Sequence, residues 1–157
     1  MNDKGTLYRS VRNDYQLHVA DVHSSTTRSY NMSRVRSKNT KPELIVRRRL
    51  HANGFRYRLH DDKLPGKPDI ILPKYKTVIF IHGCFWHGHE SCRYAALPAQ
   101  NHQFWADKIG TNVSRDEQQR VALIETGWRI ITIWGCELKP KQQETTLQKL
   151  IDRLKQY

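Results

Sequence analysis

Residues 69–92 read DIILPKYKTVIFIHGCFWHGHESC and contain the pattern that decides the fold. Asp69 opens a short run, Ile-Ile-Leu at 70–72, which is followed by the turn Pro-Lys-Tyr-Lys and then by a second apolar run at 77–81. Both runs are typical of strands, and the second is apolar enough to be buried on both faces. Helical patterns precede and follow them. We therefore predict an α/β fold with a mixed central sheet flanked by helices.

The flanking elements have signals of their own. Thr40 and Glu43 have the spacing of a capping box and Pro42 suits the first turn, which predicts a helix that ends at Gly54. Five further patterns predict a strand at 55–59, two helices at 103–109 and 113–125, a strand at 128–134, and a helix at 141–155.

The run from His82 to Cys92 directly follows the second apolar run and holds three histidines, two cysteines and an adjacent Phe-Trp pair. The third cysteine of the chain, Cys136, follows the 128–134 pattern. Parallel placement of the two predicted strands would bring it beside the loop. Three thiols and one imidazole are the composition of a structural zinc site, which leaves no coordination position open for water.

Spacing alone does not identify the histidine of this set. The candidates are His82, His87 and His89. Three unrelated thiols are the alternative, because free cysteine often acts as a small core hydrophobe.

The net charge of the chain is +12, and it is unevenly distributed. Residues 1–60 hold 13 basic and 4 acidic groups, whereas residues 61–157 hold 14 and 11. This concentration favours a polyanionic partner such as nucleic acid. A basic face that only improves solubility is the alternative.

A chain of 157 residues fits one compact domain. We expect residues 1–27 to form a mobile N-terminal extension, and residues 28–157 to form a single domain that begins with a basic arm at 28–41. We also expect a cytoplasmic protein without membrane association. The sequence has no apolar segment near 18 residues, no signal-peptide core and an odd number of cysteines.

Hydrolytic chemistry would need residues outside a closed zinc site. Asp69 opens one predicted strand and His82 ends the next, so a hairpin through residues 73–76 would bring them together in a suitable register. An aspartate at such a position is also a common turn former. Glu43 is already explained by the capping box.

Two aromatic pairs, Phe85-Trp86 and Phe104-Trp105, are unusual beside such a loop. Large aromatics near a metal site usually form local core. On a basic protein they could instead stack on bases or wedge between them.

Together these motifs resemble the very-short-patch-repair (Vsr) mismatch endonucleases. The matching strings are R-x-RSKNTKPE at 34–43, DII at 69–71, VIFIHGCFWHGH at 78–89, FW-x2-KI at 104–109, NV-x-RD at 112–116 and GWR at 127–129. They follow one another in the order of that family, over residues 20 to 150.

The resemblance implies a restriction-endonuclease-like three-layer fold and an enzyme that nicks one DNA strand beside a T:G mismatch. It implies Mg²⁺ as the catalytic cofactor, held by the carboxylate of Asp69 and the backbone carbonyl of Ile81. His87 would be the general base or acid, oriented by Asp116. His82 and Glu43 would serve metal-bound waters or the scissile phosphate. The expected substrate is double-stranded DNA with a T:G mismatch, bound by a monomer that works with mismatch-repair proteins.

The resemblance also selects the zinc ligands, which are Cys84, His89, Cys92 and Cys136. It implies that an aromatic wedge intercalates beside the mismatch and that the basic arm approaches from the other groove. The wedge residues are Phe85, Trp86 and Trp105. The arm residues are Met32, Arg34, Val35, Arg36 and Lys38.

Two alternatives remain at this stage. One is a restriction-type nuclease of the same fold with another specificity. The other is a non-catalytic, zinc-stabilised DNA-binding module, for which the set Asp69, His82, His87 and Asp116 would have no purpose.

Overall fold

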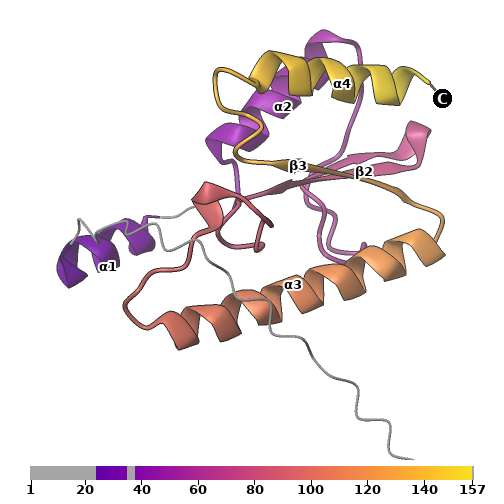
Figure 1. Cartoon of the computed structure of the whole chain (residues 1–157). Coiled ribbons are helices and arrows are strands. Elements are labelled where there is room, and N and C mark those ends of the chain that lie inside the picture. Colours follow the sequence, from indigo (N-terminus) through magenta and orange to yellow (C-terminus); the bar gives the residue numbers. More distant parts are fainter. Residues whose placement is uncertain (1–23, 35–37, 157) are drawn as a thin grey trace, which may run out of the picture.

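The computed structural model of the chain describes residues 24–34 and 38–156. Most of the predicted N-terminal extension, residues 1–23, lies outside this range, as do Val35 and Arg36 of the predicted arm. The described elements are α1 (Ser25–Ser33), α2 (Lys41–Ala52), β1 (Ile70–Leu72), η1 (Pro73–Tyr75), β2 (Thr77–His82), η2 (Arg93–Ala95), α3 (His102–Glu125), β3 (Arg129–Trp134) and α4 (Gln143–Lys155) (Figure 1).

The sheet has three strands in the order β1-β2-β3. β1 and β2 form an antiparallel hairpin in which Ile70 lies opposite Ile79, and β2 pairs in parallel with β3 in a register that joins His82 to Trp134. The predicted α/β class with a mixed sheet is therefore confirmed. The parallel placement expected for residues 77–81 and 128–134 is confirmed as well.

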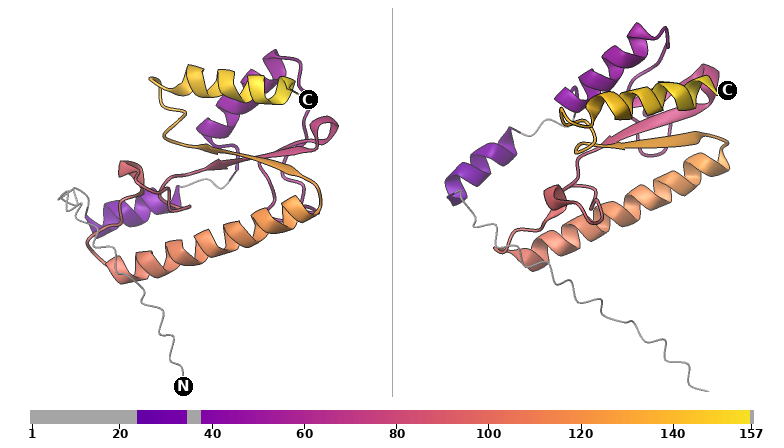
Figure 2. Two further views of the ribbon diagram at one scale, coloured as in Figure 1. Left: turned by 45° about the vertical axis from the view of Figure 1, so that its right-hand side comes forward. Right: turned by 45° about the horizontal axis from the view of Figure 1, so that its top comes forward.

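Helices cover both faces of the sheet (Figures 1 and 2). α2 and α4 lie on one face, where Val46, Leu50 and the apolar side of α4 pack against Ile79 and Ile131. α3 lies on the other face, where Leu123 packs with Ile71 and Val78. Because side chains alternate along a strand, His82 lies on the same face as Val78, toward α3.

The start of α2 follows the predicted capping box. The Glu43 amide donates to Thr40 Oγ1 at 3.5 Å, and Glu43 Oε1 accepts from the Thr40 amide at 3.2 Å. These bonds satisfy backbone groups that the first helical turn leaves unpaired. They also fix Glu43 at the end of α2 that faces the strand ends.

Two expectations about secondary structure were wrong. Residues 55–59 do not form a strand, and only an isolated β-bridge joins Arg58 to Ile71. The helices expected at 103–109 and 113–125 are one continuous helix, because Gly110 weakens a helix interior by only about 1 kcal/mol. α1 overlaps the first part of the predicted basic arm, over residues 28–33.

No helix in the described part of the chain is both long and apolar enough to cross a membrane.

Candidate active site and metal-binding cluster

A cleft of about 1190 Å³ lies where the strand ends, α3 and the start of α2 meet. Phe80, His82, Thr132 and Trp134 line it from the sheet. Its other wall comes from α3, and α2 contributes Glu43. All five residues predicted from the sequence to be catalytic line this cleft. They are Glu43, Asp69, His82, His87 and Asp116.

Asp69 immediately precedes β1 and lies beside the end of β2. Its Oδ2 accepts a hydrogen bond of 2.7 Å from the backbone amide of Ile81. The carbonyl of His82 bonds the Gly135 amide on the β3 side at 2.9 Å. Since N–H and C=O groups alternate between the two edges of a strand, the carbonyl of Ile81 faces the β1 side, where Asp69 lies. Two kinds of oxygen that bind hard cations thus face one edge.

The pKa of Asp69 is raised above its ordinary value. Burial of the carboxyl group is the main cause, and the nearby charge of Glu43 adds to it. The Ile81 amide, His60 and Arg47 act in the opposite direction. Without a bound cation, the ionised form of Asp69 is therefore held in an unfavourable environment.

His87 and Asp116 form a close pair across the cleft, with His87 Nδ1 and Asp116 Oδ2 separated by 2.5 Å. A carboxylate only accepts hydrogen bonds, so Nδ1 carries the proton of this bond. In the neutral ring, Nε2 is then the nitrogen that can accept a proton. This is the arrangement of a histidine base oriented by a carboxylate.

His82 stacks on His87, with ring centroids 3.9 Å apart and planes inclined by 7°. Burial and the neighbouring His87 lower the pKa of His82 to about 4, so its ring is neutral at neutral pH. The nitrogen lone pairs of two parallel rings lie in separate planes and do not converge on one ion. Although donor atoms of His82, His87 and Asp116 lie within 4.8 Å of one another, the stacking therefore favours proton transfer or hydrogen bonding over metal binding.

The carboxylate of Glu43 is buried and already engaged on both oxygens. Oε1 accepts from the amide and hydroxyl of Thr40, and Oε2 accepts from the amide of Asn39 and from Arg47. Glu43 lies in the cleft lining, as expected from the resemblance. These hydrogen bonds, however, already hold both of its carboxylate oxygens in place.

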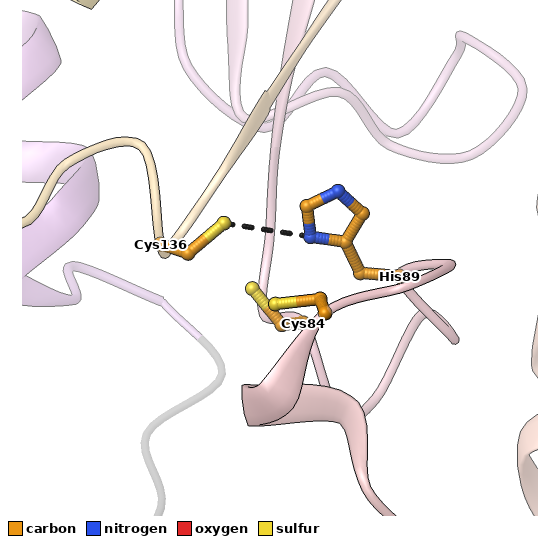
Figure 3. Close-up of side chains that lie close together, drawn as sticks. Cys84, His89 and Cys136 are labelled. Carbon is orange, nitrogen blue, oxygen red and sulfur yellow. Dashed lines mark hydrogen bonds between the residues drawn. The ribbon is translucent and has the colours of Figure 1, made fainter. Parts of the chain in front are cut away.

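A second cluster lies beside the first. Donor atoms of Cys84, His89, Cys92 and Cys136 all lie within 4.8 Å of one another. Figure 3 shows three of these side chains pointing toward one another, with His89 Nδ1 at 3.5 Å from Cys136 Sγ. His89 is thus the histidine that meets the thiols. Three thiols and one imidazole suit a tetrahedral zinc ion in both composition and size.

The thiols of this cluster interact strongly. Burial raises the pKa of Cys136 to about 12, and Cys84 and Cys92 act in the same direction. Partial desolvation also acts to raise the pKa of Cys92. Hydrogen bonds with the Tyr94 amide and the two other thiols outweigh it and hold the pKa of Cys92 below its ordinary value. Such competition for protons is relieved when a cation replaces them.

Trp134 joins the two clusters. Its ring stacks on the ring of His89, with centroids 4.0 Å apart and planes inclined by 2°. It also makes an edge contact with the ring of His82, with centroids 5.4 Å apart. Trp134 was not among the predicted site residues. Its position at the end of the last predicted strand, two residues before Cys136, was the signal that could have identified it.

The aromatic residues of the predicted wedge form one half-buried group. The ring of Phe85 makes edge contacts with the rings of Trp86 and Trp105, with centroid distances of 5.1 Å and 5.3 Å. Phe104, beside them, is 61 % exposed. In the predicted arm, Arg34 lies over the ring of Tyr30.

The remaining described arm residues lie near the start of the domain. Met32 belongs to α1, and Lys38 is exposed just before α2.

Comparison with known proteins agrees with these observations. Residues 20–93 match the family described as DNA mismatch endonuclease Vsr. The chain is 48 % identical over 123 residues to the type II nicking enzyme V.NmeAIP of Neisseria meningitidis serogroup A, covering 78 % of this chain and 87 % of that protein. The chain belongs to the Vsr family of DNA mismatch endonucleases.

Two further members show how far this similarity extends. The type II nicking enzyme V.XorIIP of Xanthomonas oryzae pv. oryzae is 45 % identical over 135 residues, which cover 85 % of this chain and 98 % of that protein. The DNA mismatch endonuclease Vsr of Escherichia coli K12 is 40 % identical over 139 residues, 88 % of each chain. The Vsr resemblance stated from the sequence motifs is therefore confirmed.

The burial of Asp69 leads to a prediction about stability. Asp69→Asn should raise the melting temperature of the protein by a few degrees at pH 7 without Mg²⁺, because it removes a charge that folding buries. The pKa of Asp69 is raised in the folded state, so the loss of folding free energy from burying its charge is complete at pH values above this folded-state pKa. The loss disappears at pH values below the ordinary pKa of 3.8. The advantage of the variant should therefore shrink as the pH falls toward 4.

Differential scanning calorimetry of both proteins measures this effect. Asp62→Asn is the matched control, because the pKa of Asp62 is lowered by Lys67 and its charge is exposed. That control should leave the melting temperature unchanged or slightly lower. A lower melting temperature for Asp69→Asn than for wild type would contradict the prediction.

Proposed function

We propose that this chain is a strand-specific nicking endonuclease that hydrolyses a phosphodiester bond beside T:G mismatches in double-stranded DNA, with Mg²⁺ as cofactor. One observation carries the proposal. In a member of the Vsr family, the Asp69–Ile81 pair and the His87–Asp116 pair line the same cleft. A cation-binding edge and an oriented base are the two parts that such a reaction needs.

We further propose that the three-layer arrangement is of the restriction-endonuclease type, and that residues 28–157 act as one domain preceded by an extension. The proposed enzyme is a cytoplasmic monomer that passes its product to mismatch-repair proteins. The excess of positive charge in residues 1–60 supports a DNA-binding role for this part of the chain.

Asp69 and the carbonyl of Ile81 are the proposed Mg²⁺ ligands, because a carboxylate and a carbonyl oxygen suit a hard cation. When bound, Mg²⁺ would polarise the phosphate, lower the pKa of a coordinated water and stabilise the leaving oxygen. The amide of Ile81 holds Asp69 Oδ2 at 2.7 Å, so the carboxylate is oriented before a cation binds.

His87 is the proposed general base. Its Nε2 would accept a proton from the attacking water, while the hydrogen bond from Nδ1 to Asp116 keeps the ring in the required tautomer and stabilises the cation that forms. The neutral ring of His82 stacks on His87 and fixes its plane. In the proposed mechanism His82 also donates a hydrogen bond to the scissile phosphate, and Glu43 serves nearby waters.

A structural zinc ion at Cys84, His89, Cys92 and Cys136 is the second proposed metal. It would fix the loop that carries both His87 and the wedge. Phe85, Trp86 and Trp105 are proposed to enter the DNA beside the mismatch, where unstacking costs less than at a normal pair. The arm residues Met32, Arg34, Val35, Arg36 and Lys38 are proposed to bind from the other groove.

Asp116→Asn tests the role of the dyad. The amide can donate to Nδ1 and so favour the wrong tautomer of His87, and the nicking rate should fall by roughly 10²- to 10⁴-fold. Single-turnover nicking of a T:G duplex measures it. Asp107→Asn, an exposed change on α3 about two and a half turns away, is the control and should nick at the wild-type rate. A rate for Asp116→Asn within about twofold of wild type would refute the assignment.

Cys136→Ser tests the proposed zinc site. Loss of one thiolate should reduce bound zinc well below one ion per chain and lower the melting temperature, because metal binding contributes directly to folding. Zinc is measured by mass spectrometry of the purified protein and stability by thermal unfolding. Glu90→Ala, an exposed change in the same loop, should retain zinc. Unchanged zinc stoichiometry in Cys136→Ser would exclude Cys136 as a ligand.

The proposed specificity is tested on three duplexes of one sequence that carry T:G, C:G or T:A at the central position. We expect Mg²⁺-dependent nicking of one strand of the T:G duplex alone. Equal cutting of all three would indicate a restriction-type nuclease of the same fold. Salt-sensitive binding without any product, at all enzyme and Mg²⁺ concentrations, would indicate a non-catalytic DNA-binding module.

A further inference from the structure

A buried polar cluster lies directly behind Asp69, and its centre is Arg47. The guanidinium group of Arg47 donates from Nη1 to Asn39 Oδ1 at 2.6 Å and from Nη2 to Glu43 Oε2 at 2.6 Å. Nη2 also lies 3.1 Å from His60 Nε2. Only 7 % of the Arg47 side chain and 4 % of the Glu43 side chain are exposed.

Helical spacing explains why this ion pair is buried. The buried face of α2 consists of Glu43, Val46, Arg47 and Leu50. Val46 and Leu50 belong to the main core, so the face that anchors the helix also carries the ion pair. An arginine held in this way is too well packed to be a solvated surface charge.

His60 reaches the cluster from the other side. The bridge between Arg58 and Ile71 is antiparallel, and two residues beyond it on the two segments lie His60 and Asp69. Because a guanidinium group has only donors, the Nε2 of His60 must be the acceptor, and its ring is neutral with a proton on Nδ1. His60 thus contributes an acceptor to Arg47 and no net charge.

Two negative charges and one positive charge lie close together in this part of the protein. Asp69 and Glu43 are two carboxylates at one end of the cleft, and Arg47 is the buried cation that pairs with one of them. Arg47 Nη2 lies 2.6 Å from Glu43 Oε2, and both side chains are buried. A single fixed positive charge therefore offsets the second carboxylate.

We propose that Arg47 is a positioning residue of the nuclease site: its guanidinium group holds Asn39, Glu43 and His60 behind Asp69 and cancels the charge of Glu43 toward a cation bound at Asp69. This inference rests on the proposed function, because it concerns the cation of that reaction. Arg47 does not line the cleft. It fixes the group beside the ligand and limits how tightly the cation is held.

The two parts of this role predict opposite changes when Arg47 is replaced. Loss of its positive charge should tighten cation binding, because the cation then meets two uncompensated carboxylates. Loss of the three hydrogen bonds should slow nicking, because Glu43 is released from its fixed position. General destabilisation would not tighten cation binding, so this combination distinguishes positioning from a merely structural role.

Arg47→Met and Arg47→Lys separate charge from geometry. Cation binding is measured without DNA by Tb³⁺ luminescence sensitised by Trp86 and Trp134, which line the same cleft, and by displacement of Tb³⁺ with Mg²⁺. Asp69→Ala identifies the signal from the proposed site. We expect Arg47→Met to bind Mg²⁺ roughly three- to tenfold more tightly than wild type, and Arg47→Lys to stay within about twofold.

Both variants should nick the T:G duplex at least roughly tenfold more slowly at saturating Mg²⁺. Arg49→Met is the matched control, since Arg49 lies on the same helix but pairs with Glu144 of α4, outside the cleft lining. It should leave cation affinity and nicking rate unchanged.

Several outcomes would overturn the inference. If Arg47→Met bound the cation with wild-type affinity, Arg47 would not weaken cation binding through its charge. If wild type and Asp69→Ala gave equal Tb³⁺ signals, the cation would not bind at Asp69. Cation binding as expected, but no nicking of T:G duplexes by the wild type, would refute the proposed function alone.

A pair of His60 variants covers the case in which Arg47→Met does not fold. His60→Gln keeps an acceptor for Arg47 and should retain the nicking rate, whereas His60→Leu removes it and should lower the rate. Equal rates for the two would overturn the inference.

Discussion

The parallel pairing of β2 with β3 is the constraint on which both clusters depend. Its register joins His82 to Trp134, so the segments that leave the two strands begin side by side. The loop after β2 then meets Cys136 after β3, and the donor atom of Cys136 comes within 4.8 Å of those of Cys84, His89 and Cys92. β1 is shorter than β2 and starts at Ile70, which leaves Asp69 to satisfy the amide of Ile81 with its side chain. A missing ladder position thus orients the carboxylate.

The short loop between His82 and Cys92 is held from two sides. Cys84 and His89 face the thiol cluster, whereas Trp86 and His87 face α3, which bonds the carbonyl of Trp86 through Asn112 at 3.1 Å. Gly88 has φ +58°, and a Cβ built there would lie 2.8 Å from Val113, so a larger residue would push the loop away from α3. The close contact between this loop and α3 holds the ring of His87 in position.

The sequence was sufficient for the elements that have strong local signals. The capping box at Thr40 and the apolar runs of β2 and β3 predicted their elements to within a residue or two. The parallel pairing of those runs was the condition that the predicted zinc site required. The choice of His89 among three histidines was not available from spacing, because it depends on how the loop turns in three dimensions. The Arg47–His60 contact was also missed. Arg47 stands four residues after Glu43, which was a usable signal, but nothing local connects either residue to His60.

The sheet also separates stability from chemistry. The larger apolar cluster lies on the face of α2 and α4, whereas the buried set toward α3 consists of Ile71, Val78 and Leu123. The cleft beside this smaller set also holds carboxylates and imidazoles, whose burial opposes folding. α2 is the element that links the two sides, because its buried face passes from Leu50 in the core to Glu43 in the cleft. Rigidity gained from apolar packing is thereby transmitted along one helix to the charged groups behind Asp69.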